Sequence, residues 1–352
     1  MMALTYDQLS NKLELNSCYP VPQPKPGEAL IQVIVAQICS TDLEIVKGYV
    51  PNFSGVLGHE FVGRVVACES KPEMLGQRVV SEINCNDGGY SCADALFQRN
   101  HAPGRSVLGI INRDGCLAEY VAVPVANLHV VPEGLRDNEA AFAEPLAAAA
   151  RIVEQGLVKP GSSVAVIGDG KLGLLCAAVL AAHSEKLDCK VTLIGRHASK
   201  MGLVAGLAAT VVLPRGEGGD EGGEADVLSA LEGKFDVVIE ASGSATGISS
   251  ALKLCRPLGT LVLKSTVSVS EGGTQWAAVA NDVVVNEKVL VGSRCGPMDV
   301  ALRMLDEHPS LRGQVNKMVW GVRSMEDAVQ AMADAATKGA IKVQVRMPVG
   351  AA

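Results

Sequence analysis

The chain has 352 residues, of which 48% are hydrophobic and 20% charged, a globular composition with ample core that excludes general disorder. Its formal net charge of -7 and pI near 5.5 argue against a nucleic-acid or anionic-membrane partner, because both need a basic face. A small-molecule partner fits this balance better, and two domains are the default at this length.

Cysteine content and apolar runs bear on the compartment. Ten cysteines in a chain of this length do not reach the density of a disulfide scaffold. The first 17 residues lack the charged-then-apolar design of a signal peptide. The longest apolar run, residues 172–182, is far shorter than the ~20 residues that cross a bilayer. We therefore expect a reducing compartment, most simply the cytoplasm.

In chain order, the N-terminal part indicates short strands between residues 13 and 38, broken by the proline-rich segment 20–27. Cys39 follows the clearest of these strands, and His59 and Glu60 come about twenty residues later, before another strand-like run. A thiolate, an imidazole and a carboxylate are side chains that Zn²⁺ binds. Each is ordinary alone, since a single Cys is usually a small buried hydrophobe. Together they are a candidate metal site.

An alanine-rich segment from residue 138 to 155 predicts a helix, with Asp137 or Asn138 as its cap and an interruption at Pro145. That interruption would place Glu144 at a break, where a carboxylate can turn toward a cleft.

A β-branched run, residues 164–167, stops at Gly168, Gly170 and Gly173 and continues into an apolar helical run. This spacing is typical of the dinucleotide-binding turn: Gly168 allows the tight turn, Gly170 the approach of a pyrophosphate, and Gly173 close helix packing. Further strands expected in this half are residues 190–194, 210–213, 235–240, 261–263 and 289–291. Strands alternating with helices predict a parallel sheet covered on both faces. The glycine- and acid-rich segment 216–224 is expected to be a surface loop.

The end of the second strand of this half faces the adenine ribose in such folds, and an acidic residue there repels a 2′-phosphate. The chain has Gly195, Arg196 and His197 at this place, without a carboxylate, and Lys200 one helical turn further on. The Arg196 guanidinium can bind a phosphate through two parallel hydrogen bonds. We therefore predict NADP(H) over NAD(H). The alternative is that Arg196 is a solvated residue and cofactor choice is loose.

Four segments occur in the order and spacing of the zinc-dependent alcohol dehydrogenases of the medium-chain dehydrogenase/reductase superfamily, which the chain resembles over nearly its whole length. They are residues 39–42 (Cys-Ser-Thr-Asp), 58–63 (Gly-His-Glu-Phe-Val-Gly), 144–146 (Glu-Pro-Leu) and 168–173 (Gly-Asp-Gly-Lys-Leu-Gly). The resemblance implies an α/β protein: a GroES-like, β-rich catalytic domain (1–146), a doubly wound Rossmann parallel-sheet domain (147–296), and a C-terminal return to the catalytic domain (297–352). It also implies a catalytic zinc at the cleft between the domains.

The same resemblance assigns individual residues. Cys39, His59 and Glu144 correspond to the zinc ligands, and Glu60 to the acidic neighbour that can exchange onto the metal. Thr41 corresponds to the hydroxyl that passes the substrate proton, and Asp42 to the carboxylate that holds the ligand histidine. Glu44 stands near the place of a histidine that hands the proton to solvent in many members. The expected cofactor contacts are Gly168, Gly170, Lys171, Leu172, Gly173, Gly195, Arg196, His197, Lys200, Ser242 and Lys342, the last either on the pyrophosphate or as a solvated lysine.

The structural-zinc lobe of the family departs from its pattern here. Members with this zinc have four closely spaced cysteines, but only Cys85 and Cys92 remain, and His101 lies nearby. We expect plain loss of the metal rather than a degenerate site of these three residues.

The resemblance implies a zinc- and NAD(P)-dependent dehydrogenase of an alcohol, aldehyde or ketone, assembled as a homodimer or homotetramer through a sheet edge near residues 283–291. One alternative is a metal-free quinone or enone reductase, whose members lack the Cys39, His59 and Glu144 set. Another is a catalytically silent nucleotide-binding or redox-sensing protein. The sequence does not specify the substrate.

Overall fold

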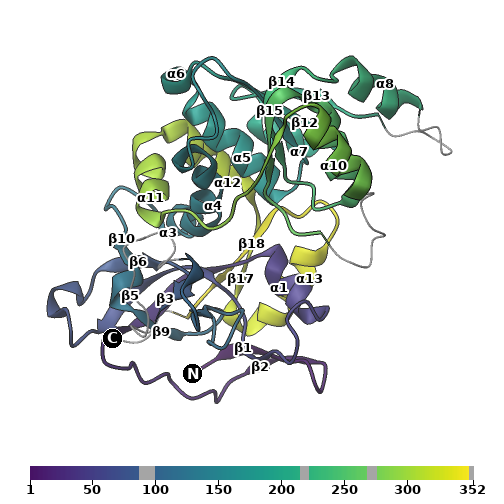
Figure 1. The fold of residues 1–352 in the computed structure, drawn as a ribbon. Helices are drawn as coiled ribbons and strands as arrows, with labels where there is room; N and C mark the ends of the chain where they lie inside the picture. Colours follow the sequence, from purple (N-terminus) through teal and green to yellow (C-terminus); the bar gives the residue numbers. More distant parts are fainter. Residues whose placement is uncertain (87–99, 215–221, 268–275, 349–352) are drawn as a thin grey trace. The chain divides into compact units, whose positions relative to one another are not determined.

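The computed structural model describes residues 1–86, 100–214, 222–267 and 276–348 (Figure 1). The chain divides into two compact units: residues 1–144 together with 297–352, and residues 145–296. The division between the first segment and the second unit falls in the first turn of helix α4 (Ala143–Glu154), whereas the sequence-based boundary is 146/147. Within the described residues, no helix has the length and hydrophobicity required to cross a membrane.

The first unit is built on β-sheets. Its main sheet has the order β10-β6-β5-β3-β18-β17, with β9 also paired to β3, and β2-β1-β4 and β7-β8 form two smaller sheets. The strands are β1 (Ala3–Asp7), β2 (Lys12–Asn16), β3 (Glu28–Ile38), β4 (Ser54–Val56), β5 (Glu60–Ala67), β6 (Arg78–Ser81), β7 (Asn84–Cys85), β8 (Ser106–Val107), β9 (Tyr120–Pro124), β10 (Leu128–Val130), β17 (Val319–Ser324) and β18 (Lys342–Arg346). The long strand β3 contacts β5, β9 and β18, so it organises this unit.

Helices of the first unit are short. They are α1 (Ser40–Val46), α3 (Asp137–Ala140), the start of α4, α11 (Met298–Glu307), α12 (Pro309–Met318) and α13 (Ala328–Ala336). The interruption that we predicted at Pro145 lies earlier, at residues 141–142 between α3 and α4. Pro145 is the third residue of α4, where its missing N–H needs no helical partner. Glu144 therefore lies in the first turn of a helix rather than at a break.

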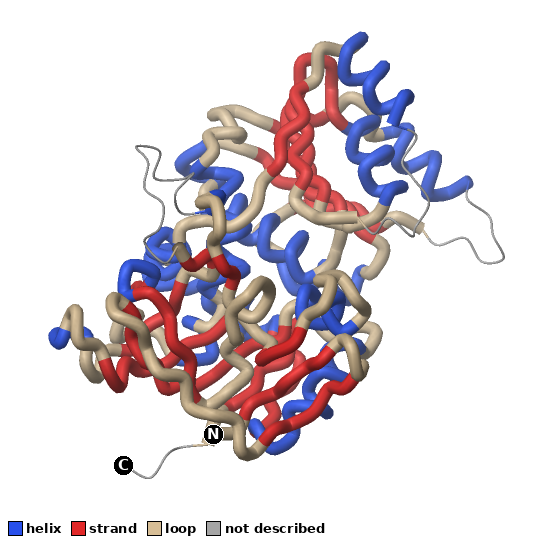
Figure 2. Tube along the Cα trace, turned by 60° about the horizontal axis from the view of Figure 1, so that its bottom comes forward, coloured by secondary structure: helices blue, strands red, loops and turns tan. Residues whose placement is uncertain are grey.

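The second unit is a parallel six-stranded sheet of order β13-β12-β11-β14-β15-β16. Its strands are β11 (Ser163–Ile167), β12 (Lys190–Gly195), β13 (Ala209–Val212), β14 (Phe235–Glu240), β15 (Cys255–Leu263) and β16 (Val289–Gly292). The helices are α5 (Lys171–Ala182), α6 (Ser184–Leu187), α7 (Ala198–Met201), α8 (Gly222–Ala230), α9 (Ala245–Leu254) and α10 (Trp276–Val285), and Figure 2 shows helices flanking the strands.

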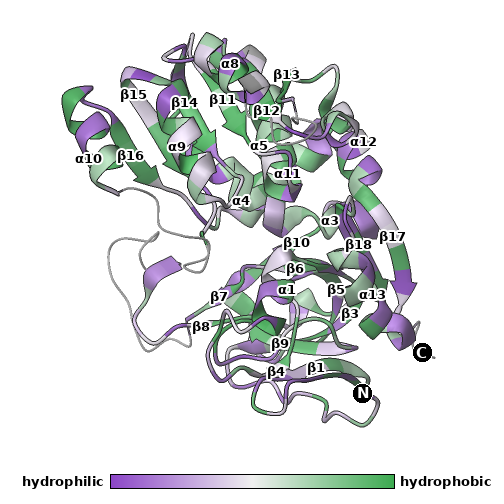
Figure 3. Ribbon diagram, turned by 90° about the vertical axis from the view of Figure 1, so that its right-hand side faces the viewer, coloured by the Kyte–Doolittle hydropathy of each residue, from purple (hydrophilic) through white to green (hydrophobic). Residues whose placement is uncertain are grey.

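The strand order reverses at β11, as in a doubly wound fold, which confirms the predicted parallel sheet. The inner strands carry the hydrophobic colour in Figure 3, and their side chains form a core with Val238 and Leu261 fully buried. Two details differ from the prediction. Of the expected loop 216–224, residues 222–224 begin α8, and the rest lies outside the described residues. Of the expected sheet edge 283–291, residues 283–285 end α10, and only residues 289–291 belong to an edge strand, β16.

Candidate metal and nucleotide sites

The end of β3 and the start of α1 position the first candidate ligand. Cys39 is the N-cap of α1, in an extended conformation, and is partly buried. Asp42, fully buried at the third helical position, accepts hydrogen bonds from the backbone N–H of Cys39 (2.7 Å) and of Gly58 (3.2 Å). One carboxylate thus joins two segments that are far apart in the sequence.

His59 and Glu60 follow the second of these segments. Gly58 has a φ of +96°, and a Cβ there would lie 2.7 Å from Leu117 Cγ, so only glycine fits the turn. His59 is 3% exposed, and its Nδ1 lies 3.4 Å from Asp42 Oδ1. Burial opposes the charged imidazole, but Asp42 and Cys39 outweigh it and raise the pKa of His59 above its ordinary value.

The side chains of Cys39, His59 and Glu60 converge. Their ligand atoms, a thiol sulfur, an imidazole nitrogen and a carboxylate oxygen, all lie within 4.8 Å of one another. Glu60 opens β5 and is fully buried, and its Oε1 has no hydrogen-bond partner among the described residues. A buried carboxylate oxygen without a partner is costly, and this donor set suits Zn²⁺. The residues therefore fit a metal ion.

Lys342 lies at this cluster. Its ammonium, 2% exposed, donates to the second oxygen of Glu60. Burial opposes its charge, but Glu60 and Cys39 outweigh that effect and raise the pKa of Lys342. This burial corrects the expectation of a solvated lysine at residue 342 and shows a partner that was not predicted, the Glu60 carboxylate. A carboxylate buried this completely needs a counter-charge, which β18 supplies.

Glu144 faces the same cluster without joining its closest group. Its carboxylate is not among the atoms that lie within 4.8 Å of one another in the described residues. Desolvation raises the pKa of Glu144 to about 7; His59 lowers it and Glu60 raises it. The Glu144 carboxylate therefore lies within electrostatic range of the cluster.

Thr41, expected to carry the proton, lies in the first turn of α1. Its Oγ1 is 3.7 Å from Cys39 Sγ, and the side chain is partly buried. Glu44, on the same helix, is exposed and pairs with Lys47 at 2.8 Å. The structure thus brings Thr41 to the cluster and leaves Glu44 at the surface.

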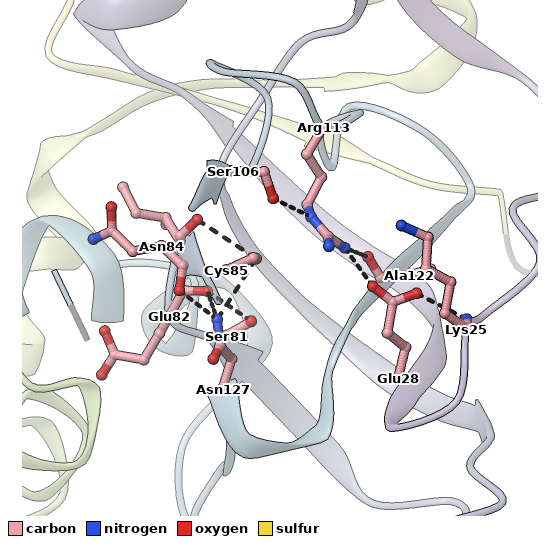
Figure 4. A network of polar contacts seen from close by, with 11 residues as sticks. Lys25, Glu28, Ser81, Glu82, Asn84, Cys85, Ser106, Arg113, Ala122 and Asn127 are labelled. Atoms are coloured by element: carbon pink, nitrogen blue, oxygen red, sulfur yellow. Dashed lines mark hydrogen bonds and ion pairs between the residues drawn. The ribbon is translucent and has the colours of Figure 1, made fainter. Parts of the chain in front are cut away.

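The second, cysteine-poor lobe is described only in part, because Cys92 lies outside the described residues. Cys85 is fully buried and receives a hydrogen bond from Asn127 Nδ2 at 3.6 Å (Figure 4). The same amide donates to the carbonyl oxygens of Glu82 and Asn84. His101 is exposed. Among the described residues, neither Cys85 nor His101 belongs to a group spaced to hold a metal.

The glycine turn of the second unit connects β11 to α5. Gly168 has a φ of +112°, and a Cβ there would lie 2.8 Å from the backbone of Ala241. A Cβ on Gly173 would lie 1.9 Å from Gly168 O, whereas one on Gly170 would meet nothing within 4 Å. Gly170, the N-cap of α5, thus leaves open the space in front of the helix N-terminus, where Lys171 and Leu172 begin the first turn. This is the cradle that a pyrophosphate needs.

The remaining expected cofactor residues lie at the carboxyl ends of β12 and β14. Gly195 ends β12 and is buried, Arg196 is exposed, and Lys200 lies in α7. Arg196 pairs with Glu224 of α8, with Nη2 2.8 Å from Oε1. Ser242, after β14, is exposed and donates to Glu240. The Arg196–Glu224 pair was not anticipated, because residue 224 was expected to lie in a loop.

Comparison with known families settles the family. The alcohol dehydrogenase GroES-like domain matches residues 25–133, and the glucose dehydrogenase C-terminus matches residues 141–347, more than half of the chain. The chain belongs to the zinc-dependent alcohol dehydrogenases of the medium-chain superfamily. The predicted pairing of a GroES-like domain with a Rossmann domain is thereby confirmed.

Individual relatives of this dehydrogenase agree. It is 29% identical to the erythritol/L-threitol dehydrogenase of Mycolicibacterium smegmatis, covering 81% of this chain and 82% of the relative. It is 32% identical to the L-threonine 3-dehydrogenase of Bacillus licheniformis, covering 67% and 68%. A protein assigned as a zinc-binding dehydrogenase from Sinorhizobium meliloti 1021, solved with NADP, superposes with a TM-score of 0.80 at 27% identity and 98% coverage of both chains. The relatives are oxidoreductases of small-molecule alcohols.

Proposed function

We propose that this protein transfers a hydride between an alcohol and the corresponding aldehyde or ketone, with one catalytic zinc and a nicotinamide cofactor. The convergence of Cys39, His59 and Glu60 within 4.8 Å carries the proposal. When bound, zinc supplies a Lewis acid for the alcohol oxygen, and the nicotinamide accepts or donates the hydride.

The chain's own residues have distinct parts in this proposal. Cys39 and His59 hold the metal, with Glu144 as the third ligand and Glu60 as the carboxylate that can exchange onto it. Asp42 fixes the orientation of the His59 ring, since its Oδ1 faces Nδ1. The Thr41 hydroxyl, whose Oγ1 lies 3.7 Å from Cys39 Sγ, relays the alcohol proton: Oγ1 accepts it while the hydroxyl gives its own proton to water.

For the cofactor we propose NADP(H) in preference to NAD(H). The exposed Arg196 guanidinium and Lys200 supply positive charge at the end of β12. Arg196 has to exchange its pair with Glu224 for the 2′-phosphate, which its two-pronged geometry permits. Titration of the purified protein with NADPH and NADH tests this preference, and tighter binding of NADH would contradict it.

For the substrate, the relatives suggest a hydroxyl beside a second polar group, as in polyols and hydroxy amino acids. A panel of simple alcohols, polyols, amino alcohols and aldehydes, assayed with both cofactors, distinguishes these classes. A metal-free quinone or enone reductase would turn over quinones without zinc. A silent sensor would bind the dinucleotide without turning over any member of the panel.

Zinc content tests the site directly. We expect one zinc per chain in the wild-type protein and less than a tenth of that in Cys39→Ala, with activity reduced to background, because a catalytic site has few ligands to spare. Cys68→Ala, which removes another buried thiol, should keep the metal. Stoichiometric zinc in Cys39→Ala would contradict the ligand assignment, and two tightly held zincs in the wild type would locate a second site.

We further propose a homodimer or homotetramer that pairs the β16 edge. This strand ends the sheet in the described part of the chain. Its first residue, Val289, is 50% exposed, and Val284 and Val285 at the end of α10 are 75% and 79% exposed. An exposed apolar strand edge favours pairing with another strand. Light scattering should give a multiple of 36.6 kDa, and Val289→Lys should lower it.

A further inference from the structure

A side-chain carboxylate lies at the carboxyl end of β12, but it does not belong to the residues that directly follow this strand. The side chain of Asp169, in the glycine turn after β11, reaches this position. Its Oδ2 accepts hydrogen bonds from the backbone N–H of Arg196 (2.7 Å) and of His197 (2.5 Å). The His197 ring Nδ1 lies 3.1 and 3.0 Å from its two oxygens. Asp169 is 9% exposed.

Sheet register explains how a residue of one turn reaches the end of the next strand. β11 and β12 are parallel neighbours with Ile167 opposite Ile194, and Gly168 N donates to Ile194 O at 2.9 Å. Residues 169 and 196 therefore leave the sheet at the same edge.

Gly195 makes room for this carboxylate. A Cβ at residue 195 would lie 2.6 Å from Asp169 Cβ and 2.7 Å from Oδ2. The absence of a side chain at this position, which the sequence suggested would admit a 2′-phosphate, instead admits the Asp169 carboxylate.

The charges around Asp169 stabilise its ionised form. Burial opposes ionisation, but the ring and N–H of His197 and the N–H of Arg196 outweigh it and lower the pKa of Asp169. The Arg196 guanidinium is not paired with Asp169, since it contacts Glu224. Asp169 therefore presents a negative charge. Its carboxylate also occupies the backbone N–H groups of Arg196 and His197, so these donors are not available to a phosphate.

We infer that Asp169 is the specificity-determining residue for the adenine ribose: its carboxylate accepts the ribose hydroxyls of an unphosphorylated cofactor and opposes a 2′-phosphate. The glycine turn thus supplies the acid that is expected after the second strand. This inference rests on the proposed use of a nicotinamide dinucleotide. Asp169 works against Arg196 and Lys200, so the balance between the three sets the ratio of the two affinities.

Direct binding tests the inference without turnover. Calorimetric titration with NADPH, NADH, adenosine 2′,5′-bisphosphate and adenosine 5′-diphosphate is run on the wild type and on Asp169→Asn. Asparagine keeps an acceptor oxygen for the two N–H groups and removes the charge. We expect Asp169→Asn to shift the NADPH-to-NADH affinity ratio toward NADPH by about tenfold or more. The affinity ratio of adenosine 2′,5′-bisphosphate to adenosine 5′-diphosphate should shift toward the bisphosphate in the same way.

Three comparisons make the result decisive. Asp188→Asn removes the same charge at the exposed turn before the other end of β12 and should leave the ratio unchanged. Asp169→Ser replaces the carboxylate with a smaller hydroxyl acceptor and should shift the ratio in the same direction if Asp169→Asn does not fold. Arg196→Ala should shift the ratio toward NADH.

An unchanged NADPH-to-NADH affinity ratio in a folded Asp169 variant that binds both dinucleotides would overturn this inference and leave the proposed function standing. If no variant and no wild-type protein bound either dinucleotide, the proposed function would fail and the inference with it.

Discussion

The two candidate sites of this protein are built on opposite principles. The cluster of Cys39, His59 and Glu60 brings together three side chains of metal-ligating types from separate segments, with His59 and Glu60 buried. The turn from Gly168 to Gly173 is a single short segment that offers backbone N–H groups and empty space. A site made of side chains loses its chemistry when one of those side chains is replaced, whereas a backbone site is lost only when a new side chain fills its empty space or the turn itself changes.

Among variants that keep the metal, the largest effect is expected from replacing Thr41, whose hydroxyl lies at the cluster. Thr41→Val should reduce kcat by a factor on the order of 10²–10⁴ because it removes the hydroxyl that relays the substrate proton, and zinc should stay bound. Thr41→Ser restores the hydroxyl and should recover most of the rate. Steady-state kinetics and metal content check both variants. An unchanged kcat in Thr41→Val, with hydride transfer shown to be rate-limiting, would remove Thr41 from the reaction.

A second test concerns the buried counter-charge. Lys342→Met leaves the buried Glu60 carboxylate without its ion-pair partner and should lower the free energy of unfolding by about 3–5 kcal/mol. Lys342→Met combined with Glu60→Gln removes both charges and should regain much of this loss. Denaturant unfolding of zinc-free protein measures the two. Equal losses in the single and double variants would show that the pair is not what stabilises the site.

Two glycines of the turn, Gly173 and Gly170, allow a matched pair of alanine variants. Gly173→Ala would place a Cβ against Gly168 O and should destabilise the second unit by about 1–3 kcal/mol. Gly170→Ala meets open space, so the protein should unfold as the wild type does while dinucleotide affinity falls. Thermal unfolding and cofactor titration separate the two effects. If both variants kept wild-type stability, the close packing of α5 on β11 would not require glycine at residue 173.

The smallest effect should come from a surface contact of the second unit. Asp236 accepts hydrogen bonds from Ser163 N–H and hydroxyl and from Arg256 Nε, which lower its pKa to about 2. Because the folded pKa lies below the ordinary 3.8, this stabilisation is present above pH 4 and is lost as the pH falls toward 2.

Asp236→Asn should therefore cost about 1 kcal/mol at neutral pH, after discounting for partial exposure, and nothing near pH 2. Asp226→Asn, an exposed aspartate in α8, should cost little at either pH. Unfolding curves at pH 7 and pH 2.5 check this. A loss that grows on acidification would contradict the sign.

The contrast between the two sites also explains what could be predicted from the sequence. Strand β14 was predicted to the residue because residues 237–239 form a β-branched run, and the glycine turn was recognised because the roles of its glycines depend only on local geometry. The ligand residues were proposed from a resemblance, and their convergence depends on tertiary structure.

Contacts between segments that are distant in the chain could not be predicted from the sequence. The pairing of Lys342 with Glu60 spans 282 positions, and nothing in either local sequence indicates it. The sequence does not indicate the position of Asp169, because an acid is expected after the second strand, whereas strand register brings this one from the turn after the first strand. The one sequence signal for this contact is Gly195, whose missing side chain leaves the space that the Asp169 carboxylate fills.

The discontinuity of the first unit has a consequence for biosynthesis. β18 pairs with β3 in antiparallel register from Val343 opposite Ile38 to Arg346 opposite Val35, and Lys342 lies at the start of β18. A ribosome adds about 5–20 residues per second, so the nascent chain passes through the whole parallel sheet before this strand exists. During that interval the carboxylate at position 60 lacks its ammonium partner and the long strand β3 has an open flank. Lys342, the counter-charge of the Glu60 carboxylate, is thus synthesised only after the whole parallel sheet, and a chain halted after residue 296 would contain the complete second unit and an incomplete first unit.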